Sequence, residues 1–116
     1  MLDDYADVIR RCQVWVAEAD TAVVGILVLA VTDEGFLLDN VAVDPRYHGT
    51  GIGRTLLELA ESEARRAGFD SVHLYTHEQM TENQRLYARI GYAEYARRTE
   101  KGYPRVYMRK PLAACR

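Results

Sequence analysis

The segment from Asp44 to Asp70, DPRYHGTGIGRTLLELAESEARRAGFD, constrains the fold of this chain more than any other. Asp44-Pro45 ends a strand-like run, because proline cannot donate to a β-ladder. Three glycines then stand within five residues. Leucine and alanine follow at helical spacing, which predicts a helix over Arg54–Ala67 that ends at Gly68. The segment therefore predicts a strand, a glycine-rich loop and a helix in direct succession.

A glycine-rich loop between a strand and a helix is also a place where a phosphate can bind. Glycine allows positive φ and close backbone approach, and the amides at a helix N-terminus attract anions. The spacing of Gly49, Gly51 and Gly53 excludes two versions of such a loop. A Walker A loop needs glycine and lysine where His48 and Arg54 stand, and no third glycine follows at the distance that the dinucleotide fingerprint requires. A structural turn and an anion-binding loop both stay open at this point.

The whole chain, residues 1–116, predicts a single α+β domain. Periodicity gives the order βββαβαββ after a short helical segment, Leu2–Arg10, and predicts a mixed, mostly antiparallel sheet with helices packed on its faces. Val23–Val31 is too continuously apolar for a surface strand and is expected in the sheet interior. Thr81 is expected to cap the second helix. The remaining expected elements are the strands Gln13–Glu18, Phe36–Val43, Ser71–Thr76, Tyr92–Thr99 and Arg105–Lys110, a hairpin turn around Lys101-Gly102, and the helix Glu82–Ile90, which Gly91 ends.

Charge and composition exclude several classes of function. The chain has a net charge of −2 and a pI of about 5.9, whereas a nucleic-acid binder usually has a basic excess. The longest apolar run, Ala22–Val31, is too short to span a membrane. Cys12 and Cys115 lie far apart, establish no disulfide framework and suit a reducing cytoplasm. His73 and His77 lie on or just after an expected strand, not on a helix, and no third ligand is evident, so no metal site is expected. We expect a cytoplasmic protein without nucleic-acid or membrane partners.

Two motifs together resemble the acetyl-CoA-binding signature of the GNAT superfamily of N-acetyltransferases. The first is NVAVDPRYHGTGIGRTLLELAESEARRAGF, in which His48 stands where the family usually has glutamine or arginine. The second is MTENQRLYARIGY, Met80–Tyr92, which is similar to a family helix with a Leu-Tyr pair and a closing Gly-Phe or Gly-Tyr. The family's asparagine lies seven residues before the tyrosine, at Met80 here, and Asn83 lies four before it. The resemblance covers about Gln13–Lys110, and we expect a short form without the strand and helices with which family members usually begin.

The resemblance implies an acetyl-CoA-dependent N-acetyltransferase that moves an acetyl group to a primary amine of a small molecule or protein by direct attack on the thioester. It implies that the strand end at Val41–Val43 parts from its neighbour and pairs with the pantetheine arm. Tyr87 is then expected to be the general acid. The candidates for the general base are residues at strand ends beside the expected cleft: Asp39 and His77 first, with Tyr75 and Glu78 as alternatives. Acetyl-CoA is the expected cosubstrate, and the residues expected to bind it are Val41, Ala42, Val43, His48, Gly49, Thr50, Gly51, Ile52, Gly53, Arg54, Asn83 and Tyr87.

Two other interpretations stay open. The chain can be a non-catalytic module that binds or senses acyl-CoA, or a purely structural α+β domain, although the latter leaves both motifs without a reason. Small family members often pair through their last strands, and the exposed edge of the final hairpin needs a cover. A homodimer is therefore expected, while the amine acceptor is not named by the sequence.

Overall fold

The computed structural model describes residues 12–112, so the expected helical segment Leu2–Arg10 and Cys115 lie outside the described residues. The α+β prediction and its order βββαβαββ are confirmed, with most element ends shifted by one or two residues. The elements are β1 (Cys12–Ala19), β2 (Ala22–Thr32), β3 (Gly35–Val43), the short 3-10 helix η1 (Pro45–Tyr47), α2 (Ile52–Arg66), β4 (Ser71–His77), α3 (Thr81–Arg89), β5 (Ala93–Glu100) and β6 (Tyr103–Pro111).

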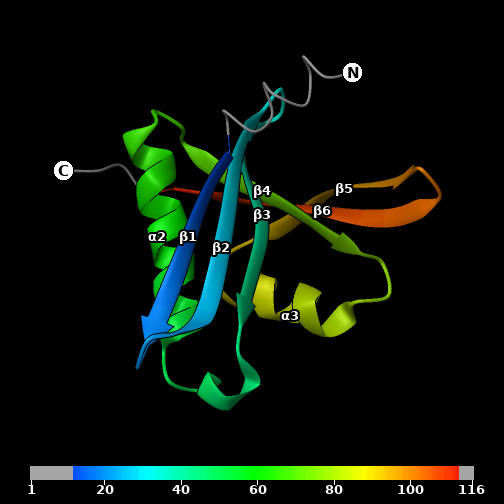
Figure 1. The fold of residues 1–116 in the computed structure, drawn as a ribbon. Helices are drawn as coiled ribbons and strands as arrows, with labels where there is room; N and C mark the ends of the chain where they lie inside the picture. The colour runs from blue at the N-terminus through cyan, green and yellow to red at the C-terminus, as the bar shows by residue number, and fades with distance from the viewer. Residues whose placement is uncertain (1–11, 113–116) are drawn as a thin grey trace.

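The strands form one six-stranded sheet in the order β1-β2-β3-β4-β6-β5 (Figure 1). All neighbours are antiparallel except β3 and β4, which are parallel and are joined through α2. Strand β2 pairs on both sides, which confirms that its apolar sequence belongs to the interior of the sheet. Among the described residues, no helix is both long and apolar enough to cross a bilayer.

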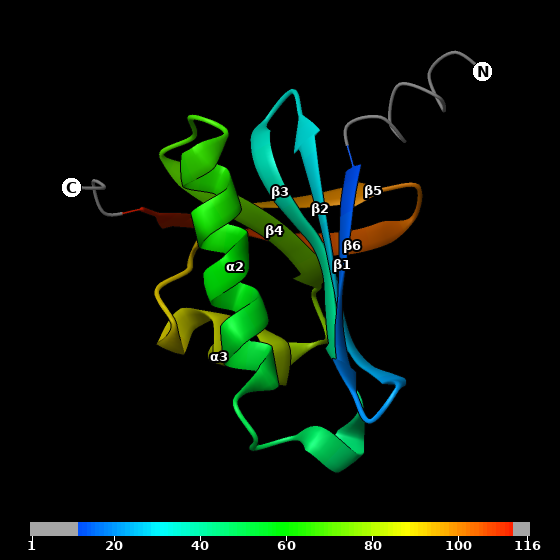
Figure 2. The same cartoon turned by 60° about the vertical axis from the view of Figure 1, so that its left-hand side comes forward.

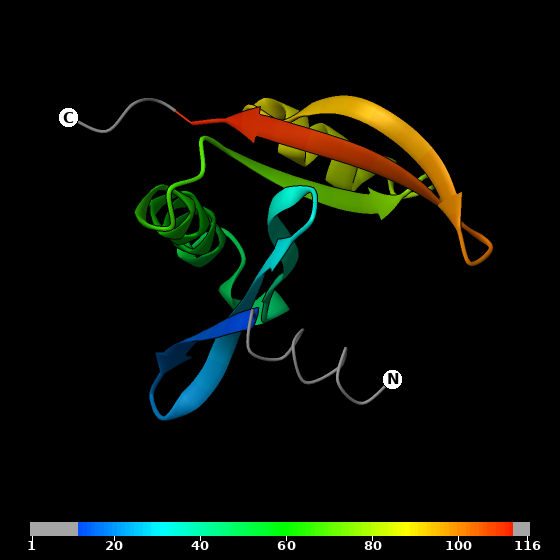
Figure 3. The same cartoon turned by 90° about the horizontal axis from the view of Figure 1, so that it is seen from above.

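Strands β3 and β4 separate after a short stretch of pairing. Their register covers only Phe36 with Val72 and Leu37 with His73. Beyond these pairs the strands diverge, so the second half of β3 has no partner on its β4 side (Figures 1 and 3). Asp39 is an extra residue in β3, since Val28 pairs with Asn40 and the next residue of β2 pairs with Leu38. A β-bulge of this kind bends the strand and increases its twist.

Both described helices lie on the same face of the sheet (Figure 2). The apolar stripe of α2 packs on β2, β3 and β4, and the apolar side of α3 joins the same core. On the opposite face, the described residues include no helix, and Val14 and Val16 of β1 are 63% and 52% exposed. The core consists of Leu27, Leu29, Phe36, Leu38, Leu56, Ala60, Ala64, Val72, Leu74, Tyr92, Val106 and Met108.

The helix ends follow the glycines that the sequence predicted. Gly68, with φ of +90°, donates to the Arg65 carbonyl, and the Phe69 amide donates to the Ala64 carbonyl, which together form a Schellman cap on α2. Gly91 ends α3 in the same way. The prediction of Thr81 as an N-cap is wrong, because the cap position is Met80 and no side chain there accepts a capping bond.

Candidate active site

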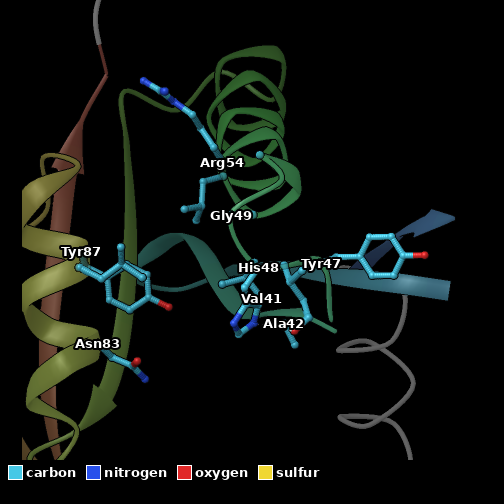
Figure 4. Close-up of a pocket in the computed structure, with 13 residues that line it drawn as sticks. Val41, Ala42, Tyr47, His48, Gly49, Arg54, Asn83 and Tyr87 are labelled. Atoms are coloured by element: carbon cyan, nitrogen blue, oxygen red, sulfur yellow. Dashed lines mark hydrogen bonds between the residues drawn. The ribbon is translucent and has the colours of Figure 1, made fainter. Parts of the chain in front are cut away.

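A cleft of about 730 Å³ opens on the helix face where β3 separates from β4 (Figure 4). The end of β3, the glycine-rich loop, the start of α2 and one face of α3 contribute its walls. Ten of the residues expected to bind the coenzyme lie in it. The lining residues are Val41, Ala42, Val43, Tyr47, His48, Gly49, Gly51, Gly53, Arg54, Leu57, Asn83, Leu86 and Tyr87.

The loop before α2 has a backbone that only glycine adopts without strain. Gly49 and Gly51 have φ of +83° and +93°. Gly51 is the N-cap of α2, and the first intrahelical bond runs from the Thr55 amide to the Gly51 carbonyl over 3.0 Å. The three preceding amides, of residues 52–54, belong to the first turn and have no acceptor inside the helix. They form a site for an anion at the positive end of the helix dipole.

Local bonds fix this loop to the end of β3. Asp44 accepts from the Arg46 amide over 2.9 Å and from the Arg46 guanidinium over 2.8 Å, which starts η1. These bonds from Arg46 hold the pKa of Asp44 at about 2. The imidazole Nε2 of His48 lies 3.1 Å from the Val43 carbonyl, so its N–H can donate there. His48 thus joins the loop to β3 as well as lining the cleft.

Helix α3 brings two polar side chains to the opposite wall. Asn83 and Tyr87 are one turn apart, and both point from α3 toward His48 and the end of β3 (Figure 4). Tyr87 is partly buried, and this burial raises the pKa of its hydroxyl above the usual value. The group is therefore protonated at neutral pH. The Tyr92 ring meets the Tyr87 ring edge-on at 5.8 Å between centroids, which supports its position from the core side.

Two residues expected to bind the coenzyme have side chains outside the cleft. The Thr50 hydroxyl donates to the Tyr47 carbonyl, and Ile52 packs against the core. The cleft also contains residues that the sequence did not single out. Leu57 was one of the apolar residues whose spacing predicted α2, and Leu86 belongs to the Leu-Tyr pair of the second motif. Nothing in the sequence marked Tyr47 as a lining residue except its place just before the glycines. Arg54 lines the cleft, but its guanidinium points outward (Figure 4).

The two candidate bases lie outside this cleft. Asp39 is exposed at the bulge of β3, and its carboxylate is close enough to the Tyr75 hydroxyl to raise the pKa of that phenol, after the larger effect of burial. His77 ends β4 and accepts a bond from the Gln79 amide at Nδ1 over 3.0 Å. It lines a separate pocket on the other face of the sheet, together with Tyr75, Thr76, Tyr103 and Arg105.

Within residues 12–112, no three histidine, cysteine or acidic side chains come together in a way that could hold a metal ion. The charged groups nearest the cleft form local pairs instead. Arg54 lies 3.9 Å from Glu58, and both side chains are largely exposed. Such an exposed pair contributes little to stability, which leaves Arg54 able to turn toward an anion.

Comparison with known sequences agrees with this geometry. The family model described as "Acetyltransferase (GNAT) domain" matches residues 10–94. Mycothiol acetyltransferase from Thermobispora bispora is 40% identical over 55 residues, which are 47% of this chain and 19% of that protein. The matched region of this chain therefore spans about a fifth of the length of that relative.

Solved structures share the fold. A GNAT family acetyltransferase from Elizabethkingia anophelis with acetyl-CoA bound has a TM-score of 0.79 at 18% identity, over 97% of this chain and 84% of that chain. Nourseothricin acetyltransferase has a TM-score of 0.78 at 23% identity, over 89% of this chain and 66% of that chain. Likeness at these identities establishes a common fold.

Proposed function

Because the chain belongs to the GNAT acetyltransferase family, we propose that it is an acetyl-CoA-dependent N-acetyltransferase that acts on a primary amine. One observation carries the proposal. The gap between β3 and β4, the glycine-capped start of α2 and the pair Asn83–Tyr87 all open into one cleft. An anion site, a free strand edge and a protonated acid are the groups that transfer from a thioester needs.

The cleft fits coenzyme A by the chemistry of its walls. The amides of residues 52–54 would bind the pyrophosphate at the helix N-terminus, and the bare glycines let the phosphates approach the backbone. Neither Gly49 nor Gly51 has a neighbouring atom within 4 Å of the place where a Cβ would stand, so the space beside both is open. Arg54 can add a positive charge at the mouth.

The free edge of β3 would hold the acyl arm. Residues Val41–Val43 have no strand partner on the β4 side among the described residues, although the Val43 carbonyl meets the His48 imidazole at 3.1 Å. An extended pantetheine with its amides can pair with such an edge as an added strand does. A backbone N–H near Val41 or Val43 is then placed to stabilise the oxyanion that forms when the amine attacks the thioester.

Proton transfer would be divided between a general acid and a general base. Tyr87 is protonated at neutral pH and can donate to the departing thiolate, whose thiol has a pKa of about 8.5. The amine arrives as ammonium, because its pKa is near 10, and must lose a proton before attack. Asp39 and His77, on the other side of the gap, are the candidates that accept this proton, directly or through water.

Two measurements test the proposal. Thermal unfolding with millimolar acetyl-CoA should show a rise in Tm, because a ligand at 100 times its Kd adds about 2.7 kcal/mol to stability. No rise would contradict coenzyme binding altogether. Release of free thiol with a panel of amines then separates an enzyme from the second candidate, a non-catalytic acyl-CoA-binding or sensing module. Binding without thiol release on any amine would favour that module, for which the apolar side chains of β1 that are exposed among the described residues give an attachment surface.

The homodimer stays a prediction. The edge strand β5 carries Arg97 paired with Glu94 at 2.7 Å and Arg98 paired with Glu34 at 2.9 Å, and such charges oppose edge-to-edge pairing. Sedimentation velocity of the full chain decides this, and a single monomeric species over the micromolar range would remove the dimer.

A further inference from the structure

A second pocket, of about 330 Å³, lies on the face of the sheet opposite the described helices. It sits at the end of β4, beside the gap that β3 leaves. Tyr75 follows the buried Leu74, and Arg105 precedes the buried Val106. Because side chains alternate along a strand, Tyr75 and Arg105 point to the face opposite the core, and so does His77, which pairs with Arg105. The rings of Tyr75 and Tyr103 give the pocket apolar walls.

Tyr75 lies between two opposite charges, Arg105 in the lining of this pocket and Asp39 outside that lining. The Arg105 guanidinium stacks on its ring at 4.3 Å from the centroid, and the Asp39 carboxylate lies near its hydroxyl. Since both charged groups contact the same phenol and a hydrogen bond spans about 3 Å, they are separated by roughly 10 Å or less. That span suits a small molecule that carries a cation and an anion on neighbouring atoms.

Arg105 has more N–H donors than its protein partners use. One of its terminal nitrogens lies 3.5 Å from Glu100, a long ion pair, and the guanidinium also bonds Tyr107, whose hydroxyl donates to Glu100. A guanidinium has five N–H groups and binds a carboxylate through two parallel bonds. The Arg105 side chain is 26% exposed, so its remaining donors can reach a ligand in the pocket that it lines.

We propose that this pocket is the acceptor subsite and that it selects a free amino acid, whose carboxylate binds Arg105 while its amine lies between Asp39 and the gap. The proposal rests on the function proposed above. Asp39 would hold the ammonium before it loses its proton, and the gap gives the amine access to the thioester from the side opposite the coenzyme cleft. A protein amino terminus, a lysine side chain or a polyamine has no carboxylate next to its amine and would leave Arg105 without a match.

The test compares three acceptors of one shape: phenylalanine, phenylalaninamide and phenethylamine. Thiol release with acetyl-CoA should give a kcat/KM for phenylalanine about ten to a hundred times that for the other two, because bonds between charged groups are the strong ones. Arg105→Gln should abolish this preference, and Arg105→Lys should keep part of it. The matched control is Arg98→Gln, since Arg98 also stacks on a tyrosine, at 4.5 Å, and pairs with Glu34, but lies outside the pocket.

The outcomes separate this inference from the proposed function. Equal kcat/KM for the three acceptors, or equal loss of preference in Arg98→Gln, overturns the amino-acid subsite while acetyl transfer stands. If no acceptor releases thiol, calorimetric titration of phenylalanine and phenethylamine into the full chain still decides the subsite. Binding of phenylalanine alone, lost in Arg105→Gln, supports it, and absence of that binding overturns it. Absence of acetyl-CoA binding contradicts the proposed function separately.

Discussion

Two glycines at the ends of α2 offer a matched pair of substitutions. Gly51 and Gly68 have nearly the same backbone, with φ of +93° and +90°, and neither has an atom within 4 Å of the position of an added Cβ. Gly51 caps the N-terminus, at the cleft, and Gly68 caps the C-terminus, away from it. Alanine at either position therefore introduces similar backbone strain, and only Gly51→Ala changes the proposed anion site.

The expected magnitudes follow from that strain. A left-handed conformation costs alanine about 1–2 kcal/mol, and the loss of freedom in the unfolded chain offsets about 0.4–1 kcal/mol. Both variants should thus lose roughly 1 kcal/mol of unfolding free energy, or about 4–8 °C in Tm for a domain near this size. Relief of the strain at Gly51 would turn the amides of residues 52–54 away from the phosphates. The loss of one bond to a charged group, about 1.5–3 kcal/mol, weakens acetyl-CoA binding about tenfold to a hundredfold.

The assay is thermal unfolding of both variants over a series of acetyl-CoA concentrations, with calorimetric titration for Kd. We expect Gly68→Ala to begin at a lower Tm but to gain the same ligand-dependent shift as the unmodified chain. Gly51→Ala should begin at a similar Tm and gain a much smaller shift. A Kd that is the same in the two variants would refute the assignment of the glycine loop as the pyrophosphate site.

Four further outcomes are expected. Tyr87→Phe should lower kcat roughly 10²–10⁴-fold with little change in the Kd of acetyl-CoA, and an unchanged kcat would contradict its role as the acid. Because Arg46 lowers the pKa of Asp44 from 3.8 to about 2, the stability from this pair is present above pH 3.8 and lost as the pH falls to 2; urea unfolding of Asp44→Asn should lack that loss. Thr21 has φ of +69° in the β1–β2 turn, so Thr21→Gly should raise the urea midpoint, and a lower midpoint would count against strain there. The Tyr92 hydroxyl is buried with no hydrogen-bond partner among the described residues, so Tyr92→Phe should raise the unfolding free energy by about 1 kcal/mol in urea denaturation.

Local patterns in the sequence were sufficient for most of the fold. Gly68 and Gly91 ended the helices as predicted, because the left-handed residue after a helix is a local requirement that glycine meets. Thr81 failed as a cap because the start of α3 is held from inside the helix. The Gln84 side chain donates to the carbonyls of His77 and Glu78, at 3.2 and 3.0 Å, and the Gln84 amide donates to the Met80 carbonyl. No rule of adjacent residues reveals a bond that spans seven positions.

The parts of the candidate site also differ in whether they depend on one short segment or on contacts between distant strands. The glycine loop and the α3 pair were predictable, since each lies within one short segment whose spacing carries the information. Tyr75 and His77 were candidates from their place at a strand end, but their meeting with Arg105 in one pocket was not predictable, because it depends on the register of the β4–β6 pairing. The contact of Arg105 with Tyr75 crosses 30 positions of sequence and two strands, and periodicity within either strand gives no sign of it.

The separation of β3 from β4 also explains why the proposed acid and the candidate bases lie on different faces of the sheet. An amine that attacks a thioester must lose a proton, while the sulfur on the far side of the carbonyl gains one, so the two proton transfers occur at different positions. A gap through the sheet allows the thioester to lie between them, with Tyr87 on the helix face and Asp39 at the bulge toward the other. Without the extra residue at Asp39, the side chains of β3 on one side of the bulge would move to the opposite face of the sheet. The strand would also lose the added twist that carries it away from β4. The bulge and the short β3–β4 register therefore act together: the register opens the gap, and the bulge places the carboxylate of Asp39, a candidate base, beside it.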